Sequence, residues 1–105
     1  MVELLLLLIA GHYLADFPLQ GEFIAKMKGR PEAMGWHCLT AHAMIQGLVV
    51  AVMVAALGHA WVAAFLAVAV THWLIDLGKV RGLYGINADQ SLHILVLLIV
   101  AVIAQ

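Results

Sequence analysis

The sequence predicts an all-α integral membrane protein, a four-helix bundle with up-down-up-down topology. Of its 105 residues, 66% are hydrophobic and 10% are charged, whereas soluble domains are closer to half apolar and a quarter charged. The apolar residues fall into four segments, each close to the roughly 20 residues that a helix needs to cross the hydrocarbon core. Lipid offers no partner to unpaired backbone groups, so these segments are expected to be helical. The alternative is a small hydrophobic subunit embedded among partner proteins.

The first helix is predicted over residues 2–19, with an extension past Pro18 to residue 26 as an alternative, because proline either kinks or ends a helix. Its apolar start lacks a basic region and a small-residue cleavage site, so it is interpreted as a retained helix and not as a signal peptide. Residues 26–32 are the one clearly polar stretch, and Gly29 and Pro31 favour a loop there. The second helix is predicted over residues 35–57.

The third helix is predicted over residues 60–77. It follows a tight link at Gly58 and His59, so the second and third helices are expected to form an antiparallel hairpin. The fourth helix is predicted over residues 88–104, with Asn87 as its N-cap and Gln90 completing a capping-box pattern. We therefore expect residues 1–105 to form a single transmembrane domain.

The basic residues predict the orientation. In an alternating topology the first and third loops share one side of the membrane, and all five Lys and Arg residues belong to these loops: Lys26, Lys28, Arg30, Lys79 and Arg81. The positive-inside rule makes that side cytoplasmic, which places both termini outside. The net charge of −1 gives no basic field, so nucleic acid is not expected as a partner.

Ionisable side chains occur inside the predicted helices, where they are costly and usually face the bundle interior. Three His/Asp pairs have i,i+4 spacing, which puts both members of a pair on one helix face. The first, third and fourth helices carry one pair each, and the second helix carries one histidine: His12 and Asp16, His72 and Asp76, Asp89 and His93, and His42. In the alternating topology all of them fall at one level, in the cytoplasmic half.

Imidazoles and carboxylates from facing helices are ligands of first-row metals, and helix bundles build such sites. The predicted ligands of a divalent metal ion are these seven residues: His12, Asp16, His42, His72, Asp76, Asp89 and His93. The set suits one metal with supporting polar partners, or two metals, and zinc, manganese and iron all fit. A metal with an open position activates water. The leading hypothesis is therefore a metal-dependent hydrolase acting on a lipid or lipid-linked substrate at the cytoplasmic face, with Asp76 or Asp89 as catalytic base.

Two alternatives remain open from the sequence. Polar side chains also join membrane helices by hydrogen bonds, so the His/Asp cluster could be a structural network in a non-enzymatic protein that binds itself, as a homo-oligomer, or a larger membrane complex. A proton or ion pathway is the weaker alternative, because the outer half of the predicted bundle has no matching chain of polar residues.

Three further residues lie near the predicted site or resemble its members. His37 is five residues from His42, about 140° round the helix, and its place beside Trp36 suits an interfacial residue. His59 lies in the opposite loop and is excluded. Lys79 follows Asp76 by three residues and could pair with it, bind anionic lipid or mark the membrane edge.

Five sequence motifs occur in order along nearly the whole chain: HYLADFPLQ (residues 12–20), the Lys-containing loop after it, AHAMIQG (41–47), HWLIDLGK (72–79) and DQSLH (89–93). Together they resemble a bacterial and phage family called domain of unknown function 3307. The resemblance implies a small multi-helix protein of the bacterial cytoplasmic (inner) membrane and no particular activity. The motif residues that it implies are His12, Asp16, Gln20, His42, His72, Asp76, Lys79, Asp89, Gln90 and His93. Gln46 stands where some members carry a second histidine, so a further ligand from the second helix is left open.

Overall fold

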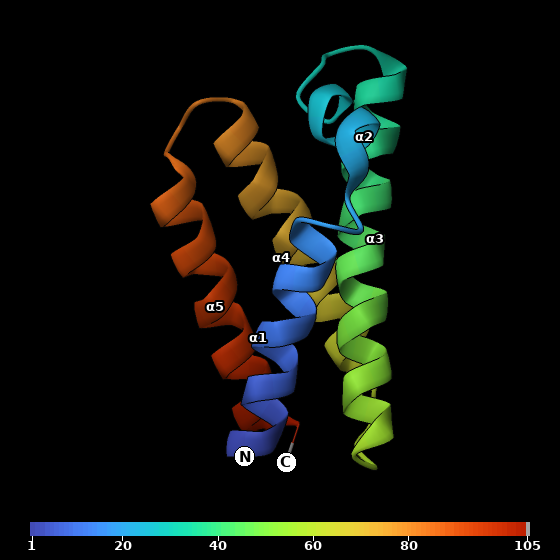
Figure 1. Cartoon of the computed structure of the whole chain (residues 1–105), viewed down its shortest axis with the longest axis vertical. Helices are drawn as coiled ribbons and strands as arrows, with labels where there is room; N and C mark the ends of the chain where they lie inside the picture. The colour runs from blue at the N-terminus through green and yellow to red at the C-terminus, as the bar shows by residue number, and fades with distance from the viewer. Residues whose placement is uncertain (105) are drawn as a thin grey trace.

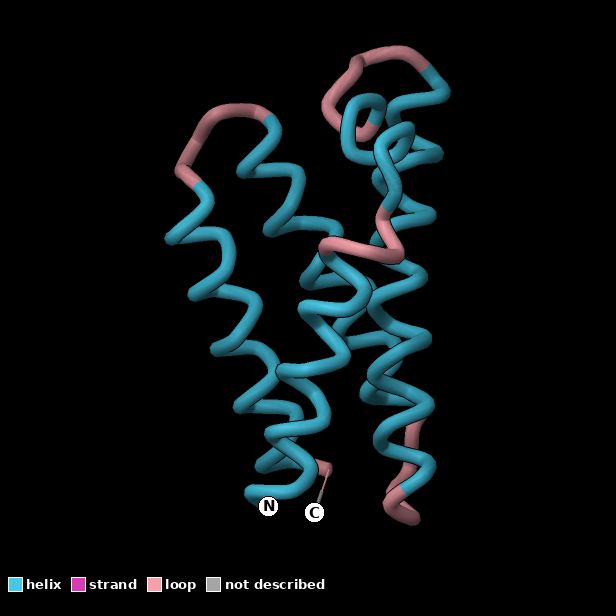
Figure 2. The backbone as a smooth tube through the Cα atoms, in the orientation of Figure 1, coloured by secondary structure: helices cyan, strands magenta, loops and turns pink. Residues whose placement is uncertain are grey.

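The computed structural model describes residues 1–104, which contain five α-helices and no strand (Figures 1 and 2). In chain order these helices are α1 (Val2–Asp16), α2 (Gly21–Met27), α3 (Ala33–Ala56), α4 (Val62–Val80) and α5 (Ile86–Ile103). The predicted all-α class is confirmed. The prediction of four helices is corrected, because a short helix, α2, stands between the first and second predicted ones.

The first predicted helix ends early, at Asp16, and does not continue to residue 19 or 26. Pro18 has no N–H to bond the carbonyl of Leu14, and the N–H of Leu19 bonds that carbonyl instead, at 3.0 Å. The chain then turns into α2, whose axis is bent by 81° from that of α1. Figure 1 shows α2 beside the N-terminal end of α3, well away from the axis of α1.

Three helices, α3, α4 and α5, are long and apolar enough to cross a membrane. The 15 residues of α1 span only about 22 Å at 1.5 Å per residue, less than the roughly 30 Å hydrocarbon core. The helix α1 is long and apolar enough to cross a membrane only when it is combined with α2, as a bent pair. Residues 1–104 are thus consistent with a membrane protein of three spans, or four if the bent pair counts as one.

The helices α3 and α4 end in the same way, with a glycine just beyond the last turn. Gly58 and Gly82 have φ angles of +82° and +78°, a left-handed conformation that costs glycine little. At each end an N–H bonds the carbonyl five residues back, His59 to Val54 at 3.1 Å and Leu83 to Gly78 at 2.9 Å, as in a Schellman motif. This ending extends α4 to Val80, three residues beyond the predicted boundary.

The start of α5 differs from the prediction. Gly85 is its N-cap, so Asn87 lies inside the first turn and no side chain caps the helix. Gln90 accordingly makes no capping box. Its side chain points into the bundle, where it contacts residues of α1.

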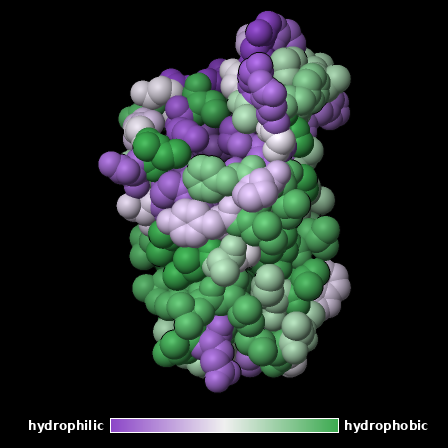
Figure 3. All heavy atoms as spheres, viewed as in Figure 1, coloured by the Kyte–Doolittle hydropathy of each residue, from purple (hydrophilic) through white to green (hydrophobic). Residues whose placement is uncertain are grey.

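The interior is divided into an apolar half and a polar half. The helix α1 packs against α3 and α5, and α4 also packs against α3 and α5. Near the two termini the core is aliphatic and includes Leu8 of α1, Val50 of α3, Val68 of α4 and Leu97 of α5. Figure 3 shows the same division on one face, with hydrophilic residues gathered at the end that holds α2 and hydrophobic residues over most of the remainder. Buried polar side chains therefore concentrate toward the hydrophilic end.

Candidate metal centre

All seven predicted ligands are buried, none more than 7% exposed, and the helices bring them together as the spacing predicts. They come from four helices: His12 and Asp16 from α1, His42 from α3, His72 and Asp76 from α4, and Asp89 and His93 from α5. Each i,i+4 pair presents both side chains to the interior from one helix face. The apolar stripe of each helix gives way to this polar segment near the same end of the molecule.

Asp16 is the hub of the cluster. Its Oδ1 accepts from His42 Nε2 at 2.9 Å and from Gln46 Nε2 at 3.3 Å, and its Oδ2 accepts from Gln90 Nε2 at 2.6 Å. The partners belong to α3 and α5, so the carboxylate joins three helices. The i,i+4 spacing puts His12 and Asp16 on one face of α1, but His12 Nε2 is 3.9 Å from Asp16 Oδ2, and the shorter contacts of Asp16 run between helices.

Three of the predicted ligands have the geometry of a metal site. Asp16, His42 and His72 each offer one ligand atom, and the three atoms lie within 4.8 Å of one another. His72 Nε2 is 3.8 Å from Asp16 Oδ1, and no residue of the described chain hydrogen-bonds this nitrogen. A carboxylate and two imidazoles are a donor set that a zinc or related first-row ion accepts, and here they come from three helices. The residues present therefore fit a divalent metal.

The remaining imidazoles lie against this group. The ring of His93 stacks on that of His72, with centroids 4.1 Å apart and an interplanar angle of 19°. The ring of His12 is 5.1 Å from that of His93, and His12 Nε2 is 2.9 Å from Gln90 Oε1. His93 Nε2 lies 3.3 Å from Asp89 Oδ1, but without hydrogen-bond geometry, and both atoms lack a hydrogen-bond partner within residues 1–104.

Asp76 is held by Lys28, which the sequence predicts only as part of a loop. Lys28 Nζ donates to Asp76 Oδ2 at 2.7 Å and to Gln20 Oε1 at 2.5 Å. The lysine is 6% exposed and directly follows α2, so the bend after α1 is what carries it over the cluster. Asp76 Oδ2 is also 3.7 Å from His42 Nε2. The basic partner of Asp76 is thus Lys28, and Lys79, one turn along α4, lies partly exposed at the end of that helix.

Two amides and this lysine complete the cluster. Gln46 and Gln90 both donate to Asp16, although spacing predicts a capping role for Gln90 and only the family resemblance places it among the motif residues. Their signal was available, since Gln90 follows Asp89 directly and Gln46 follows His42 by four residues. Lys28 had no such spacing to reveal it. His37 is exposed, and His59 lies in the link between α3 and α4, distant from the cluster along both helices.

The loop before α5 is fixed from α4. The hydroxyl of Tyr84 donates a hydrogen bond to the carbonyl of Ile75, and a Cβ at Gly78 would come within 2.5 Å of that hydroxyl. Removal from solvent raises the pKa of the Tyr84 phenol. This contact ties the loop to the turn of α4 that carries Asp76, and so fixes the start of α5 with Asp89.

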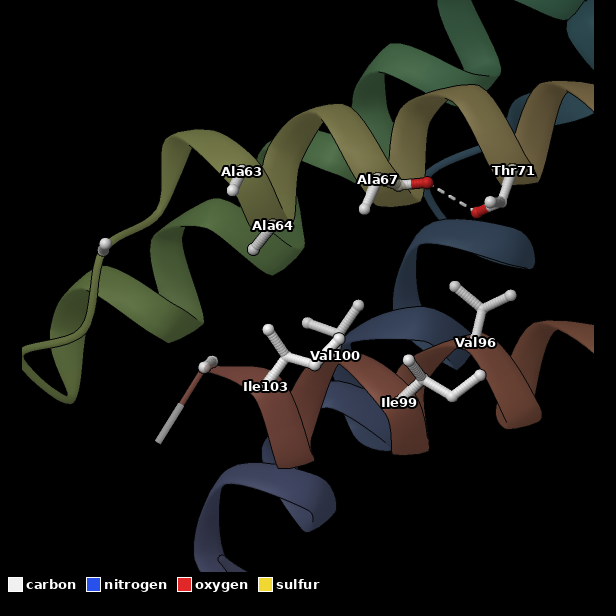
Figure 4. Close-up of a pocket in the computed structure, with 10 residues that line it drawn as sticks. Ala63, Ala64, Ala67, Thr71, Val96, Ile99, Val100 and Ile103 are labelled. Carbon is white, nitrogen blue, oxygen red and sulfur yellow. Dashed lines mark hydrogen bonds between the residues drawn. The ribbon is translucent and has the colours of Figure 1, made fainter.

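An apolar groove runs between α4 and α5, with a cavity volume of about 470 Å³. Figure 4 shows small side chains of α4 on one wall and branched side chains of α5 on the other, all pointing into the gap. Ala63 and Ala67 line it from α4, and Ile99 and Ile103 from α5. Thr71 lies at one end of the lining, so the groove ends at the turn of α4 that precedes His72 and extends from there toward the termini.

Comparison with known proteins identifies the family. The model of the family described as "Protein of unknown function (DUF3307)" matches residues 4–105, in agreement with the resemblance carried by the motifs. The comparison with curated proteins gives no match, and neither does the comparison with solved structures. Since the match covers nearly the whole sequence, the chain belongs to the DUF3307 family of proteins of unknown function.

Proposed function

We propose that this protein is a membrane-embedded hydrolase that depends on a divalent metal held by Asp16, His42 and His72. The observation that carries the proposal is the meeting of these three side chains, from three helices, with their ligand atoms within 4.8 Å of one another. Burying a carboxylate and imidazoles inside a membrane is costly and usually reflects function. Zinc, manganese and iron all accept this donor set.

The other members of the cluster suit supporting roles in such a reaction. A bound metal would supply a polarised water molecule as the nucleophile. Asp89 is the better placed general base, because its Oδ1 has no hydrogen-bond donor among the described residues, whereas Asp76 is paired with Lys28. Gln90 and Gln46 hold Asp16 in position, and such partners of metal ligands typically tune metal affinity.

We further propose that α1 and α2 together form one broken span, which gives four passes and an up-down arrangement of α1, α3, α4 and α5. The connection from α2 to α3 and the one from α4 to α5 would then face the cytoplasm, since the basic residues lie in these connections or in the last turn of the helix before each of them. In this orientation the metal cluster lies in the cytoplasmic half of the inner membrane, within reach of lipid head groups.

The groove between α4 and α5 supports a lipid substrate. Its lining is apolar, and in a bilayer a hydrocarbon chain is the occupant that matches such a surface. One end of the groove is at Thr71, beside His72. A lipid with its tail in the groove would thus present its head group to the cluster. A lipid or lipid-linked molecule is therefore the substrate class that we propose.

A second candidate function rests on the hydrogen bonds themselves. Asp16 accepts three of them, and Asp76 is neutralised by Lys28, as in a network that only holds helices together. The protein would then act by binding a copy of itself or a larger membrane complex. This candidate predicts that loss of Asp16 reduces stability and changes no metal content.

The test is hydrolysis by purified protein in phosphatidylethanolamine and phosphatidylglycerol vesicles, measured as release of a water-soluble head group. We expect release to stop with a chelator and return with Zn²⁺ or Mn²⁺, and to be lost in Asp16→Asn but not in His37→Gln, which removes an exposed histidine. Release that persists in the chelator would contradict a metal-dependent hydrolase. Absence of release in both variants and the wild type would favour the second candidate.

A further inference from the structure

We propose that Asp89 and His93 hold a second divalent metal ion, next to the first, so that the centre is dinuclear. This inference rests on the proposed function, since it assumes a metal at Asp16, His42 and His72. It assigns a site to two residues of α5 that the first metal does not use, and in this dinuclear centre Asp89 would be a ligand of the second ion in place of the general base.

The two ligand atoms are arranged to share an ion. Asp89 Oδ1 and His93 Nε2 lie 3.3 Å apart, yet they do not hydrogen-bond each other. Two ligands at 2.0–2.2 Å from a tetrahedral zinc are separated by roughly 3.3–3.6 Å. The observed distance falls in this range, and the absence of hydrogen-bond geometry leaves both atoms free to bind one ion.

Burial of Asp89 Oδ1 and His93 Nε2 without a hydrogen-bond partner costs folding free energy. The side chains of His93 and Asp89 are 3% and 1% exposed, and a buried polar atom without a partner costs about 1–3 kcal/mol, or more when charged. The position of Asp89 in the first turn of α5 favours a negative charge through the helix dipole. The dipole does not explain why Asp89 Oδ1 is directed toward His93 Nε2. That nitrogen, too, has no hydrogen-bond partner in the described part of the chain.

The second site lies beside the first. His93 stacks on His72, a ligand of the first metal, with ring centroids 4.1 Å apart. In enzymes with two-metal sites the ions are about 3.5–4 Å apart and together stabilise the attacking and the leaving oxygen. Two protein ligands at the second ion leave positions for water or a substrate oxygen. The chemical class of ligand is therefore a first-row divalent cation that accepts nitrogen and oxygen donors.

The experiment measures metal stoichiometry in the full-length protein, purified in detergent, loaded with Zn²⁺ and analysed by mass spectrometry of the metal. We expect two equivalents in the wild type and one in Asp89→Asn with His93→Gln, while His37→Gln, the matched control, keeps two. Loading with Mn²⁺ provides an independent test in unaltered protein, because two ions about 3.5–4 Å apart, as in enzymes with two-metal sites, give the electron paramagnetic resonance spectrum of a coupled pair.

The outcomes separate the inference from the proposed function. One equivalent in the wild type and an uncoupled Mn²⁺ spectrum would overturn the second site and leave the first in place. Two equivalents in both the wild type and the double variant would also overturn it, since the second ion would then bind elsewhere. No equivalents in the wild type would overturn the proposed function itself. If the double variant does not fold, the Mn²⁺ spectrum of the wild type decides.

Discussion

Lys28 and Asp76 form a buried ion pair, with Nζ 2.7 Å from Oδ2 and side chains 5% and 2% exposed. The pair connects the segment just after α2 to the polar turn of α4. It fixes the bent α1–α2 segment over the cluster. It also engages an oxygen of the Asp76 carboxylate, which makes Asp76 less available as a base. The position of α2 and the chemistry of the site are therefore coupled through these two residues.

Replacing Lys28 by methionine is expected to destabilise the protein by about 3–5 kcal/mol, because it leaves the Asp76 carboxylate buried without a counterion. Adding Asp76→Asn should recover much of this loss, since the unpaired charge is then gone. The measurement is unfolding in detergent with a helicity readout. Lys26→Met is the matched control: Lys26 pairs with Glu22 at the surface, with side chains 72% and 81% exposed, and its loss should cost less than about 1 kcal/mol. Equal effects of the two lysine variants would contradict the role of the buried pair.

Gln90→Leu is expected to weaken metal binding by about 10–100-fold, the usual effect of removing a hydrogen-bond partner of a metal ligand. The leucine cannot donate to Asp16 Oδ2 or accept from His12, both of which Gln90 contacts. Titration of the protein with Zn²⁺ against a competing chelator measures the change. Ser91→Ala is the control on the same helix and should leave metal affinity unchanged. Ser91 is exposed, and its hydroxyl donates to the carbonyl of Asn87, outside the cluster. An unchanged affinity in Gln90→Leu would assign the glutamine to structure alone.

Hydropathy and spacing were enough to predict the polar cluster, and the reason is physical. An ionisable residue is rare in a membrane helix, so an i,i+4 pair such as His72 and Asp76 specifies both a face and a depth. The break after Asp16 was harder to predict, because Pro18 is compatible with either a kink or an end. The partner of Asp76 followed from that break: Lys28 reaches the cluster only because α2 turns by 81°, a tertiary result that no local pattern encodes. The predicted cap at Asn87 was wrong for a similar reason, since Gln90 uses its side chain to contact His12 and Asp16 of α1 and not to complete a capping box.

Gly35→Ala is expected to destabilise the protein by about 3 kcal/mol or more, at the upper end of overpacking effects. A Cβ at this position would lie 2.0 Å from the carbonyl oxygen of Arg30 and 2.9 Å from that of Met27, and backbone atoms cannot rotate away. Gly85→Ala is the comparison, because a Cβ there meets nothing within 4 Å; its cost should not exceed about 1 kcal/mol. Thermal unfolding of both variants measures the difference, and a mild effect at Gly35 would contradict the close approach of the α2–α3 connection.

Ala67→Phe is expected to block lipid entry into the groove between α4 and α5 while metal content stays unchanged. Ala67 lines the groove and is exposed, so the ring would fill the groove and leave the core undisturbed. Head-group release in vesicles should fall at least tenfold, and Val52→Phe, on an exposed position of α3 outside this groove, should leave it unaltered. Unchanged release by Ala67→Phe would exclude the groove as the path of the lipid tail.

Metal content tests the central claim most directly. Full-length protein purified in detergent and loaded with Zn²⁺ should retain stoichiometric metal, and each of Asp16→Asn, His42→Gln and His72→Gln should lose the ion held by these three residues, while His37→Gln and His59→Gln retain it. Helical content measured by circular dichroism in the same samples separates loss of metal from loss of fold. Wild-type protein that retains no stoichiometric metal, and whose folding is unchanged by a chelator, would contradict the assignment of Asp16, His42 and His72 as a metal site.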